Sequence, residues 1–209
     1  MTPKSGGKRG KTTVEPFFAG NYGMSPRGRS FLPLNAGTTF PQTPVRARLK
    51  PMKYCQIDEI SSLEPGKKLV AKRTLRAEED YLLDHFPRFP VMPGVMMLEA
   101  LHQAAIWLIR TGDDFASPLV LLREARNVKF GDFLSPGETL EITAEAIKRE
   151  GTRTTVKASG QKQGRVTVSA RLILEQCDSG DPDYLGTDAD IRARNRAQFT
   201  KLFGNLATS

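Results

Sequence analysis

The chain has 209 residues, of which 39% are hydrophobic. That is enough to bury a core, so the composition excludes a protein that is disordered throughout. The formal net charge is +8, and it lies in residues 1–50, where nine basic residues stand against one acidic residue. Residues 51–209 contain 22 residues of each sign. This neutral main part lacks the basic footprint of a nucleic-acid-binding protein, and we expect no nucleic-acid partner.

Membrane, secretory and metal-binding signals are weak. The longest apolar run, residues 95–109, is short for a membrane span and contains three polar residues. Residues 1–11 are basic and Gly-rich but precede no apolar stretch of the kind that a secretory signal needs. We therefore expect a cytoplasmic protein. Cys55 and Cys177 show neither zinc-binding spacing nor a disulfide framework, and we expect no metal site.

Residues 1–51 form a basic arm rich in Pro and Gly, without a sustained hydrophobic period. Such a composition predicts a disordered or loosely draped segment. Two interpretations are open. The arm contacts an acidic partner, or it is a solvated extension with Met52 as the true first residue.

The folded part extends from Met52 to residue 176. Its first strands are predicted at residues 54–63 and 68–75, joined by a Pro-Gly turn. One helical turn is predicted at residues 78–83.

A long helix is predicted next. Pro93 suits its first turn, where the missing N–H has no intrahelical partner, and Gly112 marks its end. The run 95–109 is apolar nearly all round, so we expect the helix to be buried. Three β-rich stretches follow, at residues 118–130, 139–148 and 152–176, the last broken by a turn at residues 160–164. One buried helix wrapped by a largely antiparallel sheet is an α+β fold.

Residues 177–209 begin with an acidic loop. Thr187 and Asp190 resemble a capping box that opens an amphipathic helix. Its apolar residues are Ile191, Phe199, Leu202 and Phe203. We expect this helix to pack on the domain or on a neighbouring subunit.

The segment 84–103 concentrates the candidate catalytic residues. His85 lies among prolines that restrict its loop, which makes it a candidate base, although a loop histidine is also a common surface residue. Glu99 lies inside the apolar helix one turn before Gln103, so the two side chains share a face and can bond to each other. A carboxyl in such a place becomes protonated or finds a partner, and a raised pKa would let it donate a proton near neutral pH. His102 is interpreted as a packing or solvent residue.

Methionines cluster around the start of the helix. Met92, Met96 and Met97 fit a hydrophobic core, and their flexible side chains also suit the wall of an acyl-chain tunnel. Our candidates for such a tunnel are Phe86, Met92 and Met96.

The run that begins at His85 reads His-Phe-Pro-x-x-Pro-x-Met-Pro-Gly-Val-x-x-x-Glu-Ala-x-x-Gln. It resembles the signature of the FabZ type of (3R)-hydroxyacyl-acyl-carrier-protein dehydratases, which have the hotdog fold. The similarity extends more weakly over residues 52–176. Two departures, Asp84 in place of Gly and residues 53–56 in place of His-Arg-Tyr-Pro, indicate a divergent FabZ-like branch.

The resemblance implies a helix inside a curved antiparallel sheet, a dimer paired edge to edge, and further assembly into a trimer of dimers. It places the active site between subunits, with His85 of one chain facing Glu99 of the other. His85 would remove the C2 proton, Glu99 would protonate the departing hydroxyl, and the free N–H of Gly94 would polarise the thioester carbonyl. Pro93 and Gln103 would support the site. No metal or diffusible cofactor is needed.

The resemblance further implies dehydration of a (3R)-hydroxyacyl chain to the trans-2-enoyl product, in fatty acid or related lipid biosynthesis. The chain would arrive on the phosphopantetheine of an acidic acyl carrier protein. Candidate contacts for that partner are Arg88, Arg123, Arg126 and Lys129. Glu rather than Asp at position 99 favours the FabZ type over the sister family that also isomerises the double bond. Two alternatives stay open: a hotdog acyl-thioesterase, and a non-catalytic hotdog domain that binds acyl chains or carrier proteins.

Overall fold

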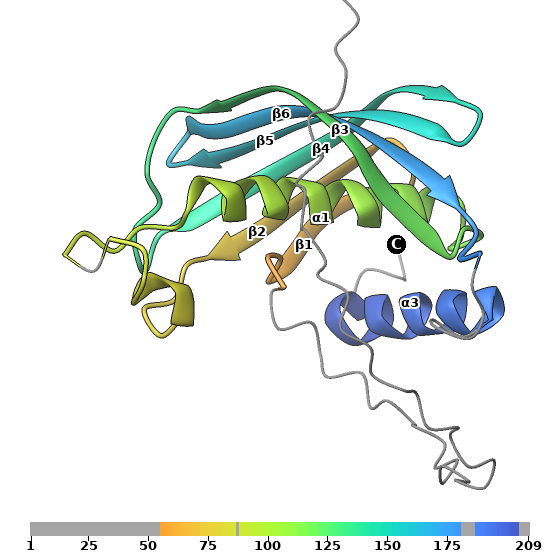
Figure 1. Ribbon diagram of the computed structural model, residues 1–209, viewed down its shortest axis with the longest axis horizontal. Helices are drawn as coiled ribbons and strands as arrows, with labels where there is room; N and C mark the ends of the chain where they lie inside the picture. Colours follow the sequence, from red (N-terminus) through yellow and green to blue (C-terminus); the bar gives the residue numbers. More distant parts are fainter. Residues whose placement is uncertain (1–54, 87, 181–186, 205–209) are drawn as a thin grey trace, which may run out of the picture. The chain divides into compact units, whose positions relative to one another are not determined.

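The computed structural model describes residues 55–86, 88–180 and 187–204 (Figure 1). The basic arm and most of the acidic loop lie outside these residues. The helices and strands, in chain order, are β1 (Glu59–Glu64), β2 (Lys68–Thr74), the 3-10 turn η1 (Asp80–Leu82), α1 (Gly94–Gly112), β3 (Leu119–Phe130), β4 (Thr139–Glu150), β5 (Arg153–Lys162), β6 (Arg165–Cys177) and α3 (Asp188–Phe203).

A hairpin opens the described chain. β1 and β2 pair antiparallel around the predicted turn, where Gly66 has a φ of 72°, a left-handed conformation that glycine adopts without strain. β1 begins at Glu59, so the prediction of a strand is wrong for residues 55–58, and residue 54 lies outside the described residues. The reason is that the backbone N–H of Gln56 bonds to the side chain of Gln103 in α1 rather than to a neighbouring strand.

The six strands form one antiparallel sheet in the order β1-β2-β4-β5-β6-β3. α1 lies along one face of this sheet and contacts all six strands (Figure 1). β1 and β3 are the edge strands, and β3 is exposed along nearly its whole length. One helix wrapped by an antiparallel sheet confirms the predicted α+β arrangement.

α1 begins directly after Pro93 and ends at Gly112, as predicted. Its buried residues are Met97, Ala100, Leu101, Gln103, Ala104, Ala105, Trp107, Leu108 and Ile109. The first turn differs from the rest, because Val95 is 68% exposed. The predicted burial therefore holds for most of the helix but not for its N-terminal end.

Gly160 lies inside β5, so the predicted turn at residues 160–164 is too long. The turn contains only Gln163 and Gly164, between β5 and β6. A side chain at position 160 would approach Leu140 at 2.8 Å and Val168 at 2.9 Å, distances that no real Cβ occupies. Glycine is needed here for close packing of the sheet against its own core, and not for a reversal of the chain.

The C-terminal helix α3 packs on the domain of its own chain. Thr187 and Asp190 form the predicted capping box. The centroids of the Phe199 ring and the Trp107 ring of α1 are 5.6 Å apart. The Asn195 side chain donates to the Pro118 carbonyl at 3.0 Å. Leu202 is 39% exposed, whereas the other three apolar residues named for this helix are buried.

Among the described residues, no helix combines the length and the apolar character needed to cross a membrane.

Candidate active site

The N-terminal end of α1 presents unsatisfied backbone donors. The Pro93 carbonyl accepts hydrogen bonds from the N–H groups of Met96 and Met97, at 2.9 and 3.2 Å. The N–H of Gly94, the first helical residue, has no intrahelical partner and makes no hydrogen bond to any other described residue. It lies at the positive end of the helix dipole, where a developing negative charge is stabilised. The Phe130 ring of β3 stands beside it, 3.1 Å from the place that a Cβ on Gly94 would occupy.

Glu99 lies on α1 slightly more than one turn beyond this end and is held by two donors. The Gln103 amide donates to one carboxyl oxygen, Oε1, at 2.8 Å, which confirms the predicted bond between the two side chains. The His102 ring contacts the other oxygen, Oε2, through Nδ1 at 3.1 Å. The interpretation of His102 as a packing or solvent residue is therefore wrong. The signal was present in the sequence, because residues three apart on a helix are neighbours.

The ionisation of Glu99 departs from the expectation of a raised pKa. Burial raises the pKa of this carboxyl, but the hydrogen bonds from His102 and Gln103 and the charge of His102 outweigh burial. The net effect lowers the pKa below its ordinary value. Of the two outcomes considered for a carboxyl in an apolar helix, this one has found partners, and in the isolated chain it is ionised.

A buried network of hydrogen bonds and ion pairs supports Gln103, the partner of Glu99. The Gln103 side chain accepts the backbone N–H of Gln56 at 2.8 Å, and the Gln56 side chain accepts Nε–H of Arg73 at 3.1 Å. Arg73 is 2% exposed and forms ion pairs with Asp58 and Glu79. Because every member has a partner, the network holds Gln103 in one orientation. Sequence reasoning missed it, since the contacts join distant parts of the chain.

The same network reaches the loop that carries His85. Glu79, which pairs with Arg73, is the residue that precedes η1. The backbone N–H of His85 donates to the Tyr81 carbonyl in η1 at 3.0 Å, so the loop begins from a fixed turn. The hydroxyl of Tyr81 is buried, and burial together with the neighbouring Glu79 raises the pKa of Tyr81 to about 12.

The His85 imidazole is half-buried and lies against the Phe86 ring, with 4.3 Å between the ring centroids. The ring makes no hydrogen bond to any described residue. Phe86 has a φ of 50°, an uncommon conformation for a bulky residue, and this is a mark of a constrained loop. No hydrogen bond or ion pair joins His85 to Glu99 within the described chain.

The tunnel candidates are not gathered around one cavity. Phe86 lines an apolar surface hollow of about 590 Å³ together with Arg88, Phe89 and Phe133. Met92 is 1% exposed and belongs to the core, and Met96 is partly buried against that core. An acyl tunnel through these residues stays a prediction.

The four basic candidates for a carrier-protein contact are exposed. Arg123 pairs with Glu175, and Arg126 pairs with Glu124 at 2.6 Å, both on the edge strand β3 or its neighbour β6. Lys129 also lies on β3, whereas Arg88 lies in the loop after His85. A contact with a carrier protein through these residues stays a prediction.

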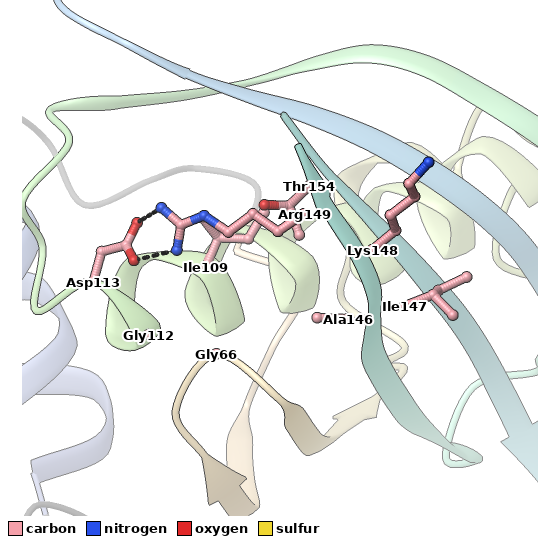
Figure 2. Close-up of a pocket in the computed structure, with 9 residues that line it drawn as sticks. All are labelled: Gly66, Ile109, Gly112, Asp113, Ala146, Ile147, Lys148, Arg149 and Thr154. Atoms are coloured by element: carbon pink, nitrogen blue, oxygen red, sulfur yellow. Dashed lines mark hydrogen bonds and ion pairs between the residues drawn. The ribbon is translucent and has the colours of Figure 1, made fainter. Parts of the chain in front are cut away.

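A second cavity, of about 220 Å³, lies at the opposite end of α1 (Figure 2). Gly112 and Asp113 line it, and Asp113 is bound by Arg149 through two hydrogen bonds of 2.6 and 2.9 Å. A helix of 19 residues is about 28 Å long, so this cavity is far from Gly94. Asp113 and Arg149 neutralise each other, and Lys148, which also lines the cavity, pairs with Glu150 at 2.8 Å.

The fold and the site together define a hotdog-type α+β domain with a carboxylate near the N-terminal end of its central helix. Residues 49–175 match a family described as the FabA-like domain, and the chain belongs to this family.

Relatives in this family are dehydratases. The chain is 33% identical over 118 residues to the 3-hydroxyacyl-[acyl-carrier-protein] dehydratase FabZ of Clostridium tetani, covering 56% of this chain and 83% of the relative. It is 38% identical over 98 residues to the FabZ of Clostridium kluyveri, covering 47% and 68%. A dehydratase heterocomplex, ApeI:P from Xenorhabdus doucetiae, has a similar fold, with a TM-score of 0.54 and 17% identity over 63% of this chain and 88% of that one.

Proposed function

We propose that the chain dehydrates (3R)-hydroxyacyl groups carried on acyl carrier protein to the trans-2-enoyl thioester. The observation that carries the proposal is the carboxyl of Glu99, fixed by two donors inside a buried helix whose first N–H groups are free. Membership of the FabA-like family and the identity to FabZ enzymes support the same reaction.

Removal of the proton at C2 of the substrate is assigned to His85. Dehydration begins with removal of the proton at C2, and neutral imidazole is the side chain suited to this task near neutral pH. The His85 ring has no hydrogen bond to a described residue, so its nitrogens are available to a substrate. The negative charge that develops on the thioester oxygen is stabilised by the N–H of Gly94.

Protonation of the departing hydroxyl at C3 is assigned to Glu99. Its side chain is 40% exposed in the single chain, so water stabilises the ionised form. A bound substrate and a second chain would remove that water, which raises the pKa and favours the neutral acid. In that form Glu99 donates its proton to the hydroxyl at C3, which departs as water. His85 then returns its proton to the solvent, and the carboxyl is protonated again.

We further propose that two chains pair through β3 and that each site uses His85 of one chain and Glu99 of the other. β3 is a 12-residue edge strand, and a bare edge of this length is a template for another strand. β3 also exposes three large apolar side chains, Leu121 (40% exposed), Leu122 (37%) and Phe130 (51%). Assembly into a trimer of dimers and a cytoplasmic location stay predictions from the sequence.

Recognition of the carrier protein is assigned to exposed basic residues. Arg88 and Lys129 make no ion pair with described residues and are free to contact an acidic partner. Arg123 and Arg126 would first have to leave Glu175 and Glu124.

A single assay separates this function from its alternatives. The purified protein is incubated with a (3R)-hydroxyacyl-carrier-protein and, separately, with a crotonyl thioester. The proposal predicts enoyl formation from the first, hydration of the second, and no release of free thiol. Free thiol would identify a thioesterase, and binding without turnover would identify a non-catalytic domain.

A further inference from the structure

His102 holds a position that the dehydration chemistry has not yet used. It lies one turn beyond Glu99 on α1, its side chain is 18% exposed, and its Nδ1 is 3.1 Å from the Glu99 Oε2. Its other ring nitrogen, Nε2, is buried and has no hydrogen-bond partner in the described chain. The ring therefore makes one polar contact there, and that contact is with the candidate catalytic carboxyl.

These contacts assign the proton on the ring. An ionised carboxylate only accepts hydrogen bonds, so Nδ1 must carry the proton. Nε2 is then left buried without a hydrogen-bond partner in the described chain. The other tautomer would bury an unpaired N–H at Nε2 and set the Nδ1 lone pair against the carboxylate, which is less favourable on both sides. His102 is thus a donor to Glu99.

Two donors fix the carboxyl completely. Gln103 binds Oε1 and is itself anchored by the backbone of Gln56, while His102 binds Oε2. A carboxyl held at both oxygens cannot rotate about its terminal bond without losing a charge-assisted hydrogen bond. Its remaining lone pairs therefore keep one direction before any substrate arrives.

Other charged groups do not compete with His102 for this role. The contacts that lead from Glu99 through Gln103 and Gln56 end at Arg73, whose charge is neutralised by Asp58 and Glu79. In the described part of the chain, His102 is the one titratable group whose charge acts on the Glu99 carboxyl.

We propose that His102 is a positioning residue of the dehydration site, which donates its Nδ1–H to Glu99 and, with Gln103, holds the carboxyl in the orientation needed for proton transfer to the substrate hydroxyl. The catalytic consequence rests on the proposed function, whereas the contact itself does not.

Two variants of matched shape test the proposal. In His102→Asn the side-chain amide nitrogen can take the place of Nδ1 and retain a donor. In His102→Leu a side chain of the same branching has no donor. We expect His102→Leu to lower kcat on the order of tenfold with little change in KM, and His102→Asn to recover most of that loss. Melting temperatures measured on the same samples establish that both variants are folded.

A second readout does not depend on turnover. The Glu99 carboxyl is titrated by NMR in protein labelled with ¹³C at glutamate side chains, with Glu99→Gln used for assignment. Loss of a donor to the ionised form should move the Glu99 pKa upward in His102→Leu, and His102→Asn should bring it back toward the wild-type value.

The outcomes are separable. If His102→Leu keeps both the wild-type kcat and the wild-type Glu99 pKa, His102 only fills space and the proposal is overturned. If His102→Asn resembles His102→Leu in both readouts while remaining folded, donation from the ring is also overturned. If the wild type turns over no hydroxyacyl thioester, the proposed function fails, but the titration still decides whether His102 donates to Glu99.

Discussion

The two ends of α1 differ in how well the chain covers their apolar side chains and pairs their polar groups. At the N-terminal end the Gly94 N–H has no partner in the described chain and Val95 is 68% exposed. At the C-terminal end Trp107 is 2% exposed beneath Phe199 of α3, and Asp113 is bound by Arg149. One helix therefore has a closed C-terminal end that its own chain covers, where only Nε of Arg110 is buried without a partner among the described residues of the helix end, and an open N-terminal end. The closed end stabilises the fold, and the open end is where a substrate and a second chain can supply the missing contacts.

The largest expected difference between the two ends concerns their carboxyl groups. Glu99→Gln keeps the size of the side chain but cannot transfer a proton, and its amide nitrogen can no longer accept a hydrogen bond from one of the two donors, His102 or Gln103. We expect it to lower kcat by about 10²- to 10⁴-fold without a large change in melting temperature. The control is Asp113→Asn at the other end of α1, which should leave turnover close to that of the wild type. Equal losses of turnover in Glu99→Gln and Asp113→Asn would contradict the assignment of the chemistry to the N-terminal end of α1.

The glycines at the two ends should also behave differently. Gly94→Val places a branched side chain where the thioester approaches the free N–H, and loss of one oxyanion donor costs about 10²- to 10³-fold in kcat. Gly112→Ala affects folding instead, because its Cβ would lie 2.5 Å from the Gly66 backbone. Such overpacking costs about 1 to 3 kcal/mol of unfolding free energy. Turnover and thermal unfolding are measured on the same samples.

The Phe130 ring must be controlled for in this test, since a Cβ at position 94 meets it at 3.1 Å. Phe130→Ala is combined with Gly94→Val to make room for the valine. If the double variant recovers the turnover of Phe130→Ala alone, the loss came from displacement of the ring. Persistent loss supports the role of the Gly94 backbone.

The aromatic contact between α3 and α1 should matter for stability alone. Phe199 is 8% exposed and packs against the rings of Trp107, Phe115 and Phe203. Phe199→Ala should lower the free energy of unfolding by about 3 kcal/mol, as for other large truncations in a core. Well below the melting temperature, kcat should be unchanged. A fall in kcat in the folded variant would show that the closed end contributes to the chemistry.

The smallest expected effect is the pH dependence of the Asp113 ion pair. Burial raises the pKa of Asp113, but hydrogen bonds from Arg149 and Gln176 outweigh it, so the pKa in the folded chain lies below the ordinary value. The unfolded chain then binds a proton more readily than the folded one, and the stabilisation is lost as the pH falls through the folded-state pKa. Asp113→Asn should cost about 1 kcal/mol or less at neutral pH. Urea unfolding at neutral and acid pH should show this difference shrinking on acidification.

Local patterns predicted the parts of the molecule that depend on neighbouring residues. The turn at Gly66, the helix between Pro93 and Gly112, and the capping box of Thr187 are short-range features with direct physical signatures. The bond between Glu99 and Gln103 followed from helical spacing.

Features that join distant segments could not be predicted in this way. The Arg73 network links residues 17 and 47 positions apart through Gln56, and no periodicity marks such a link. Gly160 looked like a turn residue because only the packed sheet reveals the side chains above it. The lowered pKa of Glu99 is a different case, because its partner His102 lies only three residues away on the same helix, but helical spacing alone does not set the direction of the ring.

The central claim is that His85 and Glu99 perform one dehydration in a site shared between two chains. The direct measurement is turnover of a (3R)-hydroxyacyl-carrier-protein by His85→Ala, by Glu99→Gln, and by an equimolar mixture of the two after subunit exchange. We expect each variant alone to be nearly inactive and the mixture to regain part of the wild-type activity, because some mixed dimers contain one site with both groups. A mixture that stays inactive despite demonstrated exchange would contradict a shared site, and a fully active single variant would contradict the chemistry itself.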